Sequence, residues 1–463
     1  MIIKLTNSLT RKKEEFKPIY EGKVGIYSCG LTVYGAGHVG NYRTFIMSDI
    51  LRRLFEFNGY EVKHVMNITD VGHLVGDVDD GEDKMIVAMK REGKSAWDVA
   101  AFYTDLFTKD MERLNNKTPH VLPKATDHIP EQIETVKILE EKGFTYKTSD
   151  GIYFDTSKLD NYGQLGGQKL DEKEEGARVV INPEKRNATD FALWKFSPKA
   201  QQRDMEWDSP WGIGFPGWHI ECSAMAEKYL DSPFDIHTGG SDLAPVHHEN
   251  EIAQTQGAHG NGLANVWLHA AFLQIDGGKM SKSLNNVYTI QDLVNKGFNP
   301  LAYRYFTFNA NYRTQLNFTW EALEAAQNAL NNLRDESRDW DEPIEVSENI
   351  IESFKEKIND DLDLPGAMAV LWGMVGDKEL ATGIKSATLL KLDEVLGLNL
   401  DVYVAHSIEI PGDVQELLNQ RASARQKGDW DASDALRDQI AQAGFVVEDT
   451  DSGQRLREKH VLK

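Results

Sequence analysis

The stretch KVGIYSCGLTVYGAGHVGNYRTF, residues 23–45, contains three structural signals in a row. Its first six residues, KVGIYS, predict a buried strand. A turn rich in glycine follows, and apolar residues then recur at helical spacing as far as Gly59, which can end the helix. The turn glycines are Gly35, Gly37 and Gly40, and the apolar stripe is Ile46, Ile50 and Leu54. A strand, a glycine-rich turn and a helix together predict the start of a nucleotide-binding fold.

The tetrapeptide HVGN, residues 38–41, lies where the predicted helix begins. Unpaired backbone amides at a helix start favour a phosphate, and the imidazole of His38 can donate a hydrogen bond to it. A histidine near a glycine turn is more often structural, so this tetrapeptide alone leaves both interpretations open.

A second candidate phosphate site follows the strand predicted at residues 265–275, NVWLHAAFLQI. It is a DGG loop followed by KMSKS, residues 279–283. Lysine is a flexible point charge and serine adds hydroxyl donors, so this loop is suited to gripping a triphosphate. A solvated basic loop is the alternative. An intact KMSKS after a strand is nonetheless a more specific signal than HVGN.

The stretch DSPFDIHTGGSDLAPVHHENE, residues 231–251, is the best candidate for a metal site. If a helix opens at His247, the side chains of His247 and Glu251 lie one turn apart on one face. The chain has only two cysteines, Cys29 and Cys222. Thiolates, an imidazole and a carboxylate are ligands that zinc accepts, so these four residues form a candidate set. Alternatively, the cysteines are small core residues and HHENE is an exposed helix start.

The chain has 463 residues, of which 41% are hydrophobic and 27% charged, as is usual for a globular protein of about three domains. Its 51 Lys and Arg against 73 Asp and Glu give a formal net charge of −22, so nucleic-acid binding must depend on local patches. We expect no membrane span and no signal peptide. With two cysteines, too few for a disulfide framework, the expected location is cytoplasmic.

Between these motifs, a second strand is expected at residues 60–69, followed by an acidic loop at residues 72–83. The spacing of the acidic residues does not match a calcium loop, which favours a solvated insertion. Helices are expected as far as about residue 142. A hairpin turning at residues 149–151 indicates an inserted region over about residues 116–207.

The second half of the chain is expected to be mainly helical. Thr319 can cap a helix with a regular apolar stripe. Further helices are expected at residues 350–358, 366–375 and 384–396. After a linker, two helices at residues 414–426 and 431–443 and a strand-like FVVED form a last unit. The tail contains a modest basic patch of Arg455, Arg457, Lys459 and Lys463.

Five features occur along one chain in the order Cys29, HVGN, GWHIEC, HHENE and KMSKS. On these motifs the chain resembles the class I aminoacyl-tRNA synthetases and, among them, the cysteinyl-tRNA synthetase family. The resemblance runs from LTNSLTRKKEEFKP to VVEDT and so covers nearly the whole chain.

The resemblance implies an α/β fold in three parts. A Rossmann-like parallel-sheet catalytic domain, with the inserted region, would occupy residues 1–318 and end in a KMSKS loop and stem-contact region at about residues 276–318. An α-helical bundle would follow at residues 319–400. A small C-terminal mixed α/β module at residues 401–463 would bind the anticodon.

The functional residues of the family map onto these motifs by position. The resemblance implies that ATP is bound by His38, Gly40, Asn41, Lys279, Ser281 and Lys282, and that His38, Asn41, Lys279 and Lys282 act in catalysis. It implies zinc ligation by Cys29, Cys222, His247 and Glu251. It implies cysteine binding by Trp218, Thr69 and His237, and anticodon recognition by Trp430, Asp434 and Asp449.

The implied activity is that of a cysteine–tRNA ligase. ATP would activate L-cysteine to cysteinyl-adenylate, and the cysteinyl group would then pass to the 3′ end of tRNA(Cys). Magnesium would accompany ATP, and one zinc ion per subunit would distinguish the thiolate from the hydroxyl of serine. Since four protein ligands normally close a zinc site, the substrate sulfur would enter as a fifth ligand or loosen Glu251. The expected partners are tRNA(Cys), L-cysteine and ATP, no membrane association is expected, and the protein is expected to be a monomer.

Three positions depart from the family pattern. Asn41 stands where many members have a second histidine, which suggests that amide donors serve there. The loop at residues 72–83 lengthens the segment after NITDV without an evident role. Leu456 stands between two arginines where the family often has tryptophan, so one stacking contact to tRNA is in doubt.

Two other functions compete with this interpretation. A tRNA-independent ligase that joins cysteine to an amino sugar would keep the zinc and ATP sites but would not need residues 401–463. A non-catalytic tRNA-binding paralogue would tend to lose its catalytic signatures, and both are intact here.

Overall fold

The computed structural model describes residues 1–72, 84–166, 182–197, 203–281, 284, 286–450 and 453–458. The chain forms two compact units. The first consists of Met1–Ile290, Thr307–Phe318 and Lys355–Ala367, and the second of Gln291–Phe306, Thr319–Phe354 and Met368–Lys463. Residues 73–83 of the acidic loop at 72–83, together with Lys282, Lys459 and Lys463, lie outside the described residues, so what the sequence indicates for them stays a prediction.

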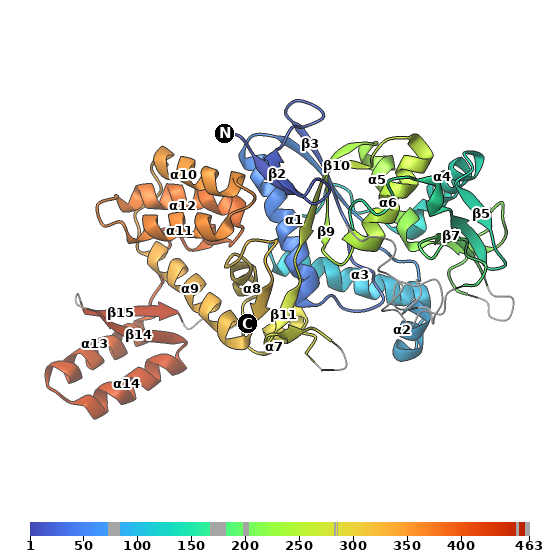
Figure 1. Cartoon of the computed structure of the whole chain (residues 1–463). Coiled ribbons are helices and arrows are strands. Elements are labelled where there is room, and N and C mark those ends of the chain that lie inside the picture. The colour runs from blue at the N-terminus through green and yellow to red at the C-terminus, as the bar shows by residue number, and fades with distance from the viewer. Residues whose placement is uncertain are drawn as a thin grey trace. The chain divides into compact units, whose positions relative to one another are not determined.

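A four-stranded parallel sheet forms the centre of the first unit (Figure 1). Its strands, in spatial order, are β10 (Ala264–Ala270), β9 (Phe234–Gly240), β3 (Lys23–Ser28) and β4 (Glu61–Met66). The strand order reverses at β3, because β4 lies on one side of it and β9 on the other. In open parallel sheets, ligands bind at the carboxyl ends of the strands beside such a reversal. The predicted Rossmann-like α/β fold is confirmed.

Helix α1 (Val39–Phe57) packs against β3, β4 and β9. The predicted stripe of Ile46, Ile50 and Leu54 is at most 1% exposed, which explains why this segment docks on the sheet. The helix begins with a capping box in which the backbone N–H of Asn41 donates to His38 Nδ1 at 3.2 Å and the backbone N–H of His38 donates to Asn41 Oδ1 at 3.0 Å. Gly59, at φ 85°, follows the helix as predicted.

Helices α5 (Trp218–Leu230) and α6 (Glu249–His259) pack on one another, and α5 contacts β3 and β4. A π-helical turn, η4 (Ala244–His248), leads into α6. Its defining bond runs from the N–H of His248 to the C=O of Leu243, five residues earlier, at 2.9 Å. The ordinary helix start that the sequence suggested at His247 is therefore replaced by a wider turn, and α6 begins two residues later.

The inserted region contains a four-stranded antiparallel sheet. Its strands, in spatial order, are β5 (Thr145–Lys147), β6 (Gly151–Phe154), β7 (Phe191–Phe196) and β8 (Gly214–Pro216). The predicted hairpin at residues 149–151 joins β5 and β6. The sheet continues to β8, past residue 207. Two helices, α2 (Lys84–Glu92) and α3 (Ala96–Arg113), precede this region, and its own helical segments are η1 (Ala125–His128), α4 (Ile129–Glu141) and η2 (Thr156–Lys158).

The KMSKS segment extends from a small three-stranded sheet of β11 (Leu273–Ile275), β12 (Gly278–Lys279) and β13 (Leu316–Phe318). The sequence predicted one continuous strand at residues 265–275, but the chain leaves the central sheet after Ala270 and starts β11 at Leu273. At this break the N–H of Ala271 donates to the C=O of Tyr312 at 2.8 Å. A hairpin of β1 (Lys4–Asn7) and β2 (Lys12–Glu15) completes the strands of this unit.

The later part of the chain is mainly helical, as expected. Its helices before the C-terminal module are α7 (Ile290–Asn295), α8 (Pro300–Thr307), α9 (Trp320–Arg338), α10 (Glu348–Asn359), α11 (Leu364–Gly376), α12 (Thr382–Leu396) and η6 (Leu400–Val402). Thr319 Oγ1 accepts from the N–H of Ala322 at 3.1 Å and caps α9 as predicted. Within the described part of the chain, no helix combines the length and apolar character needed to cross a bilayer.

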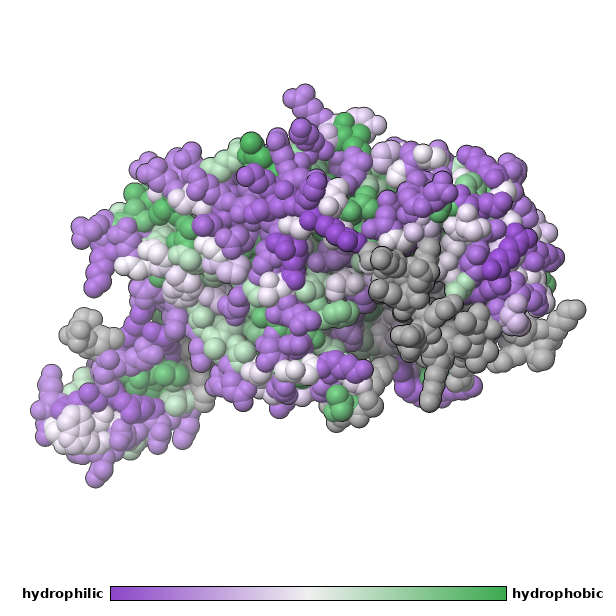
Figure 2. Space-filling model, in the orientation of Figure 1, coloured by the Kyte–Doolittle hydropathy of each residue, from purple (hydrophilic) through white to green (hydrophobic). Residues whose placement is uncertain are grey.

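The C-terminal module consists of α13 (Gly412–Gln426), α14 (Trp430–Gln442) and a hairpin of β14 (Phe445–Thr450) and β15 (Gly453–Glu458) (Figure 1). Its small core is formed by Val414, Leu418, Ile440 and Val447. Leu456, which stands where the family often has tryptophan, packs against this core. The face of the molecule in Figure 2 is largely hydrophilic, in keeping with the excess of charged acidic residues.

Candidate active site

Four side chains converge at the carboxyl end of β3, where the strand order reverses. Cys29 follows β3 directly, and Cys222 lies on α5. His247 lies in η4 and Glu251 one turn later on α6. All four are buried, and one ligand atom from each lies within 4.8 Å of those of the others. The structure thus brings together the residues that the sequence singled out as candidate zinc ligands.

The donor atoms of this group face one another closely. Cys29 Sγ lies 3.8 Å from Cys222 Sγ and 3.8 Å from Glu251 Oε1. His247 Nε2 lies 3.1 Å from Glu251 Oε1. The other ring nitrogen of His247, Nδ1, lies 3.0 Å from His219 Nδ1, which orients the imidazole. Two thiols, an imidazole and a carboxylate give this set the chemistry of a zinc site.

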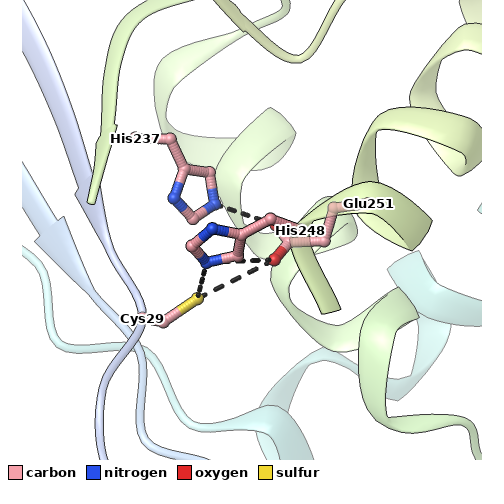
Figure 3. A group of neighbouring side chains, drawn as sticks. All are labelled: Cys29, His237, His248 and Glu251. Carbon is pink, nitrogen blue, oxygen red and sulfur yellow. Dashed lines mark hydrogen bonds and ion pairs between the residues drawn. The ribbon is translucent and has the colours of Figure 1, made fainter. Parts of the chain in front are cut away.

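A second group shares two members with the first. Cys29 and Glu251 also lie within 4.8 Å of His237 and His248 (Figure 3). His248 Nε2 lies 3.3 Å from Cys29 Sγ, and His237 Nε2 lies 2.9 Å from Glu251 Oε2. Sequence reasoning missed His248 as a member of the cluster. Its position three residues before Glu251 was a usable signal, since residues at i and i+3 share a helix face.

Further side chains fix the orientation of His237 and His248. His248 Nδ1 lies 2.8 Å from His269 Nε2, and His269 Nδ1 lies 2.8 Å from Ser8 Oγ. The ring of His237 stacks on Trp267 with centroids 4.4 Å apart and planes 13° from parallel. Gly239 makes room for this arrangement, because a Cβ there would lie 2.6 Å from His248 Cε1. The two histidines are therefore held in place on the sides facing away from the cluster.

The cluster is electrostatically polarised. Burial alone would raise the pKa of Glu251, but the adjacent imidazoles of His237 and His247 lower it to about 2. Burial opposes protonation of His247, yet its contacts with Cys222 and Glu251 raise its pKa to about 10. A hydrogen bond from Cys29 lowers the pKa of Cys222 to about 7 in spite of burial. A buried carboxylate and a readily ionised thiol are ligands suited to a divalent cation.

The three residues expected to bind cysteine surround this cluster in different ways. Trp218, the first residue of α5, has its ring centroid 4.6 Å from that of His247. His237 belongs to the cluster itself. Thr69 is buried, its Oγ1 accepts from Asn67 Nδ2 at 3.0 Å, and its backbone pairs with Leu31 and Val33, just after Cys29. Thr69 thus supports the loop that carries the first thiol.

The two predicted phosphate-binding signatures lie side by side. A Cβ at Gly40 would lie 3.1 Å from the ring of His38 and 3.4 Å from Met280 Cε, so the HVGN and KMSKS segments are in contact range. The N–H of Val39 donates to the C=O of Tyr288 at 2.8 Å, and His38 pairs with Thr289. This arrangement brings exposed Lys279 and the start of α1 to one region.

Asn286, which sequence reasoning missed, closes the KMSKS loop. Its Oδ1 accepts from the N–H of Ser281 at 2.7 Å, and its Nδ2 donates to the C=O of Lys279 at 3.1 Å. The dipeptide of asparagines after KMSKS was the available signal, because asparagine side chains commonly bond loop backbones. Lys282, the expected ATP contact, lies outside the described residues.

The candidate anticodon residues lie in the C-terminal module. Trp430 is 59% exposed, so it is not a buried anchor between two helices, and the guanidinium of Arg425 lies 5.2 Å from its ring centroid. Asp434 forms an ion pair with Arg437 at 3.2 Å. Asp449 accepts two hydrogen bonds from Arg421, both at 3.0 Å. An exposed aromatic ring beside an arginine is a surface suited to an unpaired base.

Two known families match different parts of the chain. Residues 15–328 match the family described as "tRNA synthetases class I (C) catalytic domain". Residues 408–457 match the "Cysteinyl-tRNA ligase anticodon binding domain". Among solved structures, Mycobacterium tuberculosis methionyl-tRNA synthetase in complex with methionyl-adenylate superposes with a TM-score of 0.57 at 17% identity, over 89% of this chain and 96% of that protein. At this identity the likeness concerns the fold alone.

Curated relatives are similar over their full lengths. Cysteine–tRNA ligase 1 of Burkholderia lata is 49% identical over 457 residues, which cover 98% of this chain and 97% of the relative. The cysteine–tRNA ligase of Treponema denticola is 41% identical, over 97% of this chain and 98% of the relative. With these relatives, the two family matches and the converging side chains all in agreement, the chain belongs to the cysteinyl-tRNA synthetase family of class I aminoacyl-tRNA synthetases.

Proposed function

We propose that this chain, a cysteine–tRNA ligase by family, selects L-cysteine with a zinc ion held by Cys29, Cys222, His247 and Glu251. The observation that carries the proposal is the burial of two thiols, an imidazole and an ionised carboxylate with donor atoms within 4.8 Å of one another. Zinc bound there would favour the thiolate of cysteine over the hydroxyl of serine, which differs by one atom. Its fifth ligand would be the substrate sulfur, or Glu251 would loosen to admit it.

The choice of Cys222 and His247 over His237 and His248 has a physical reason. The contacts of His237 and His248 with Glu251 and His269 resemble those of His247 with Glu251 and His219, so the histidines do not decide the choice, and the sulfur does. Cys222 adds a second sulfur, and zinc binds thiolates strongly.

Cys222 and His248 provide the decisive test, since each belongs to one group only. We expect Cys222→Ala to lose stoichiometric zinc and to weaken the thiolate charge-transfer absorption of the cobalt-substituted protein. His248→Asn should keep two thiolates on cobalt, with affinity lowered by about 10–100-fold because it loses an orienting partner. The opposite pattern, an unchanged cobalt spectrum in Cys222→Ala, assigns the ion to the second group.

Selection itself is tested by charging total tRNA with labelled cysteine and labelled serine. The zinc-loaded enzyme should charge cysteine and reject serine. Removal of zinc by a chelator should abolish cysteine charging, and added zinc should restore it. Metal-free enzyme that still charges cysteine selectively would exclude the metal from recognition.

For the first step, the proposed residues act on the ATP phosphates. His38, Gly40 and Asn41 at the start of α1 would offer donors, and Lys279, Ser281 and Lys282 would neutralise the triphosphate together with Mg²⁺. His38, Asn41, Lys279 and Lys282 are the proposed catalytic residues. Because attack of the carboxylate on the α-phosphate requires alignment and charge compensation, these groups would act by positioning and electrostatics. A Cβ at Gly40 would lie 3.4 Å from Met280 Cε, and this proximity supports the proposal that the two signatures bind the same ATP.

Trp218, Thr69 and His237 are proposed to line the cysteine pocket. The contact of the Trp218 ring with His247 supports its place beside the substrate side chain. Thr69 would act through the loop after Cys29, to which its backbone is bonded.

The C-terminal module is proposed to read the anticodon of tRNA(Cys) through Trp430, Asp434 and Asp449. The exposure of Trp430 supports stacking on an unpaired base. We expect Trp430→Ala to raise the KM for tRNA(Cys) by about tenfold, since stacking contributes about 1–3 kcal/mol per base, and to leave ATP–pyrophosphate exchange unchanged. Trp430→Phe should retain most of the affinity. A wild-type KM for tRNA(Cys) in both variants would show that Trp430 does not contact the tRNA.

The proposal also covers the oligomeric state, the location and the domain boundaries of the protein. We propose a monomeric, cytoplasmic enzyme with catalytic, bundle and anticodon-binding parts at residues 1–318, 319–400 and 401–463. The match of residues 408–457 to an anticodon-binding family disfavours the amino-sugar ligase.

A further inference from the structure

Arg43 lies in the second turn of α1, two residues after HVGN, and is 3% exposed. Its guanidinium donates to four backbone carbonyls on two other segments. Nη1 donates to Ala271 at 2.8 Å and to Phe272 at 3.0 Å, and Nη2 donates to Thr314 at 2.5 Å and to Asn311 at 3.4 Å. A single buried side chain therefore ties the helix of the first ATP signature to two loops.

Both loops lead into the sheet that carries the second ATP signature. Residues 271–272 connect β10 to β11, and residues 311–314 precede β13. β11 lies between β12, which contains Lys279, and β13. Downstream of the KMSKS loop, the N–H of Val39 donates to Tyr288 at 2.8 Å. Helix α1 thus holds the KMSKS segment on both flanks, through Arg43 before it and through Val39 after it.

The loop that Arg43 grips is itself fixed. Tyr312 Oη donates to Asp361 Oδ1 at 2.8 Å, and Arg313 Nε donates to Asp361 Oδ2 at 2.8 Å. The same carboxylate accepts from the N–H and Oγ1 of Thr6, both at 2.7 Å. Since Asp361 is buried and held by these donors, the carbonyls that receive the Arg43 guanidinium cannot simply follow the helix if the arginine is lost.

We propose that Arg43 is a positioning residue for adenylate formation, which fixes the KMSKS-bearing sheet at the distance from α1 that the triphosphate requires. The inference rests on the proposed function, in which the two signatures bind one ATP. A planar guanidinium can bond two segments at once in a set geometry, whereas the ammonium of lysine is a point charge. Alignment of a phosphate for in-line attack is sensitive to displacements of about 1 Å. Arg43 acts on the chemical step without touching ATP or cysteine.

Arg53 provides a matched control on the same helix. It is 7% exposed, and its guanidinium donates to Asp49 at 2.7 Å and to the C=O of Asn115 at 2.8 Å, both of which lie outside the KMSKS sheet. Replacing either arginine with alanine removes a buried cation from α1. Only Arg43→Ala releases the two loops.

The test is cysteine-dependent ATP–pyrophosphate exchange by zinc-loaded, full-length protein. We expect Arg43→Ala to lower kcat at least about tenfold, with zinc content and the Kd for cysteine as in the wild type. Arg53→Ala should have kcat close to the wild type. Free guanidinium chloride at low concentration should restore part of the kcat of Arg43→Ala and leave Arg53→Ala unaffected. Arg43→Lys, which keeps the buried charge but not the fork, should show the same selective loss of kcat.

Three results would overturn the inference. These are an unchanged kcat in Arg43→Ala, an equal fall of kcat in Arg53→Ala, and loss of zinc or cysteine binding in parallel with kcat. If Arg43→Ala does not fold, the same readouts on Arg43→Lys decide the question. Wild-type protein that shows no cysteine-dependent exchange would refute the proposed function itself, whereas active wild type with fully active Arg43 variants would refute only the role of Arg43.

Discussion

At the scale of single residues, Gly30 is constrained by backbone packing next to the first thiol. A Cβ at this position would lie 1.7 Å from the C=O of Asn67, and the N–H of Gly30 donates to Asn67 Oδ1 at 2.9 Å. The obstacle is a main-chain oxygen, so it cannot rotate away. A larger residue must displace the Cys29–Gly30 segment or the segment after β4.

We expect Gly30→Ala to destabilise the protein by about 1–3 kcal/mol and to reduce zinc loading, because Cys29 moves with its neighbour. Gly373, in the interior of α11, is the control, since nothing lies within 4 Å of a Cβ there. Gly373→Ala should be neutral or stabilise by about 0.5–1 kcal/mol. Thermal unfolding and metal analysis measure both effects. Normal zinc content in a folded Gly30→Ala protein would contradict the expectation.

His64 predicts a specific acid sensitivity. Burial, with the nearby charge of Arg52, lowers its pKa to about 3, and its Nε2 lies 2.9 Å from Ser28 Oγ. The unfolded chain therefore takes up this proton at a higher pH than the folded chain. The stabilising contribution of neutral His64 is fully present above about pH 6.5 and is lost as the pH falls from 6.5 toward 3.

Between pH 7.5 and 5.5, this one group lowers the free energy of unfolding by about 1.4 kcal/mol. We expect His64→Gln, which cannot titrate in this range, to be less sensitive to the same pH change by that amount. Urea titrations of both proteins at the two pH values measure the difference. Identical pH dependence in the two proteins would show that His64 is not held neutral.

The candidate ligands show which contacts between residues can be predicted from a sequence. His247 and Glu251 were predictable from their helical spacing, and the scarcity of cysteine pointed to Cys29 and Cys222. The partners of Arg43 were not predictable, because they are backbone carbonyls and any residue type supplies one. Such contacts depend on where the loops lie after folding.

At the scale of secondary structure elements, the start of α1 combines a structural and a proposed catalytic task. Asn41 Oδ1 accepts the N–H of His38, so this asparagine closes a capping box. The Nδ2 donors of the same side chain remain the groups proposed to face ATP. The sequence suggested only the second task.

Two substitutions separate these tasks. We expect Asn41→Ala to lose both, with a cost of about 0.5–2 kcal/mol in stability and a marked fall in adenylate formation. Asn41→Asp should retain the cap, since a carboxylate oxygen accepts the same hydrogen bond, but its charge should repel the phosphates and keep exchange low. Melting temperatures and ATP–pyrophosphate exchange provide the two readouts. Full exchange activity in Asn41→Asp would leave Asn41 with the capping role alone.

Elements were predicted best where local pattern and tertiary contacts agree. The strand predicted at residues 23–28 has the same bounds as β3. The apolar side chains that suggested the strand are the ones that are buried in the core. The strand predicted at residues 265–275 is broken at 271–272, where the C=O of Ala271 accepts from the Arg43 guanidinium and its N–H donates to the C=O of Tyr312. The π-helical turn η4 was also not predictable, although it lets the adjacent His247 and His248 both reach the cluster.

At the scale of the whole molecule, the formal net charge is −22. Whether an arginine adds to a positive surface therefore depends on which carboxylates lie beside it. Arg455 and Arg457 belong to the basic patch that the sequence indicates near the C-terminus. Both contact α9 within the second unit. Arg455 pairs with Asp339 at 2.6 Å, and Arg457 pairs with Asp335 at 3.3 Å. Sequence composition indicated the positive charge, but only the fold shows which carboxylates neutralise it.

We expect Arg455→Ala to loosen the attachment of β15 to α9. The linker at residues 406–411, which precedes α13, should then be cleaved faster by a nonspecific protease at low salt, with a smaller difference from the wild type at high salt, where ion pairs are screened. Arg437→Ala is the control, because its partners Asp434 and Asp449 lie in the same module as Arg437. Equal acceleration in both variants would point to loosening of the module itself.

The strand order of the central sheet also has a consequence for biosynthesis. β9 lies between β3 and β10, so the sheet cannot close until the ribosome has passed residue 270, more than halfway along the chain. Until then Cys29 and Cys222 lack the neighbours that bury them, and the nascent polypeptide carries two open thiols. Released chains truncated before β9 should accept a maleimide label on both cysteines, whereas the full-length protein should resist it.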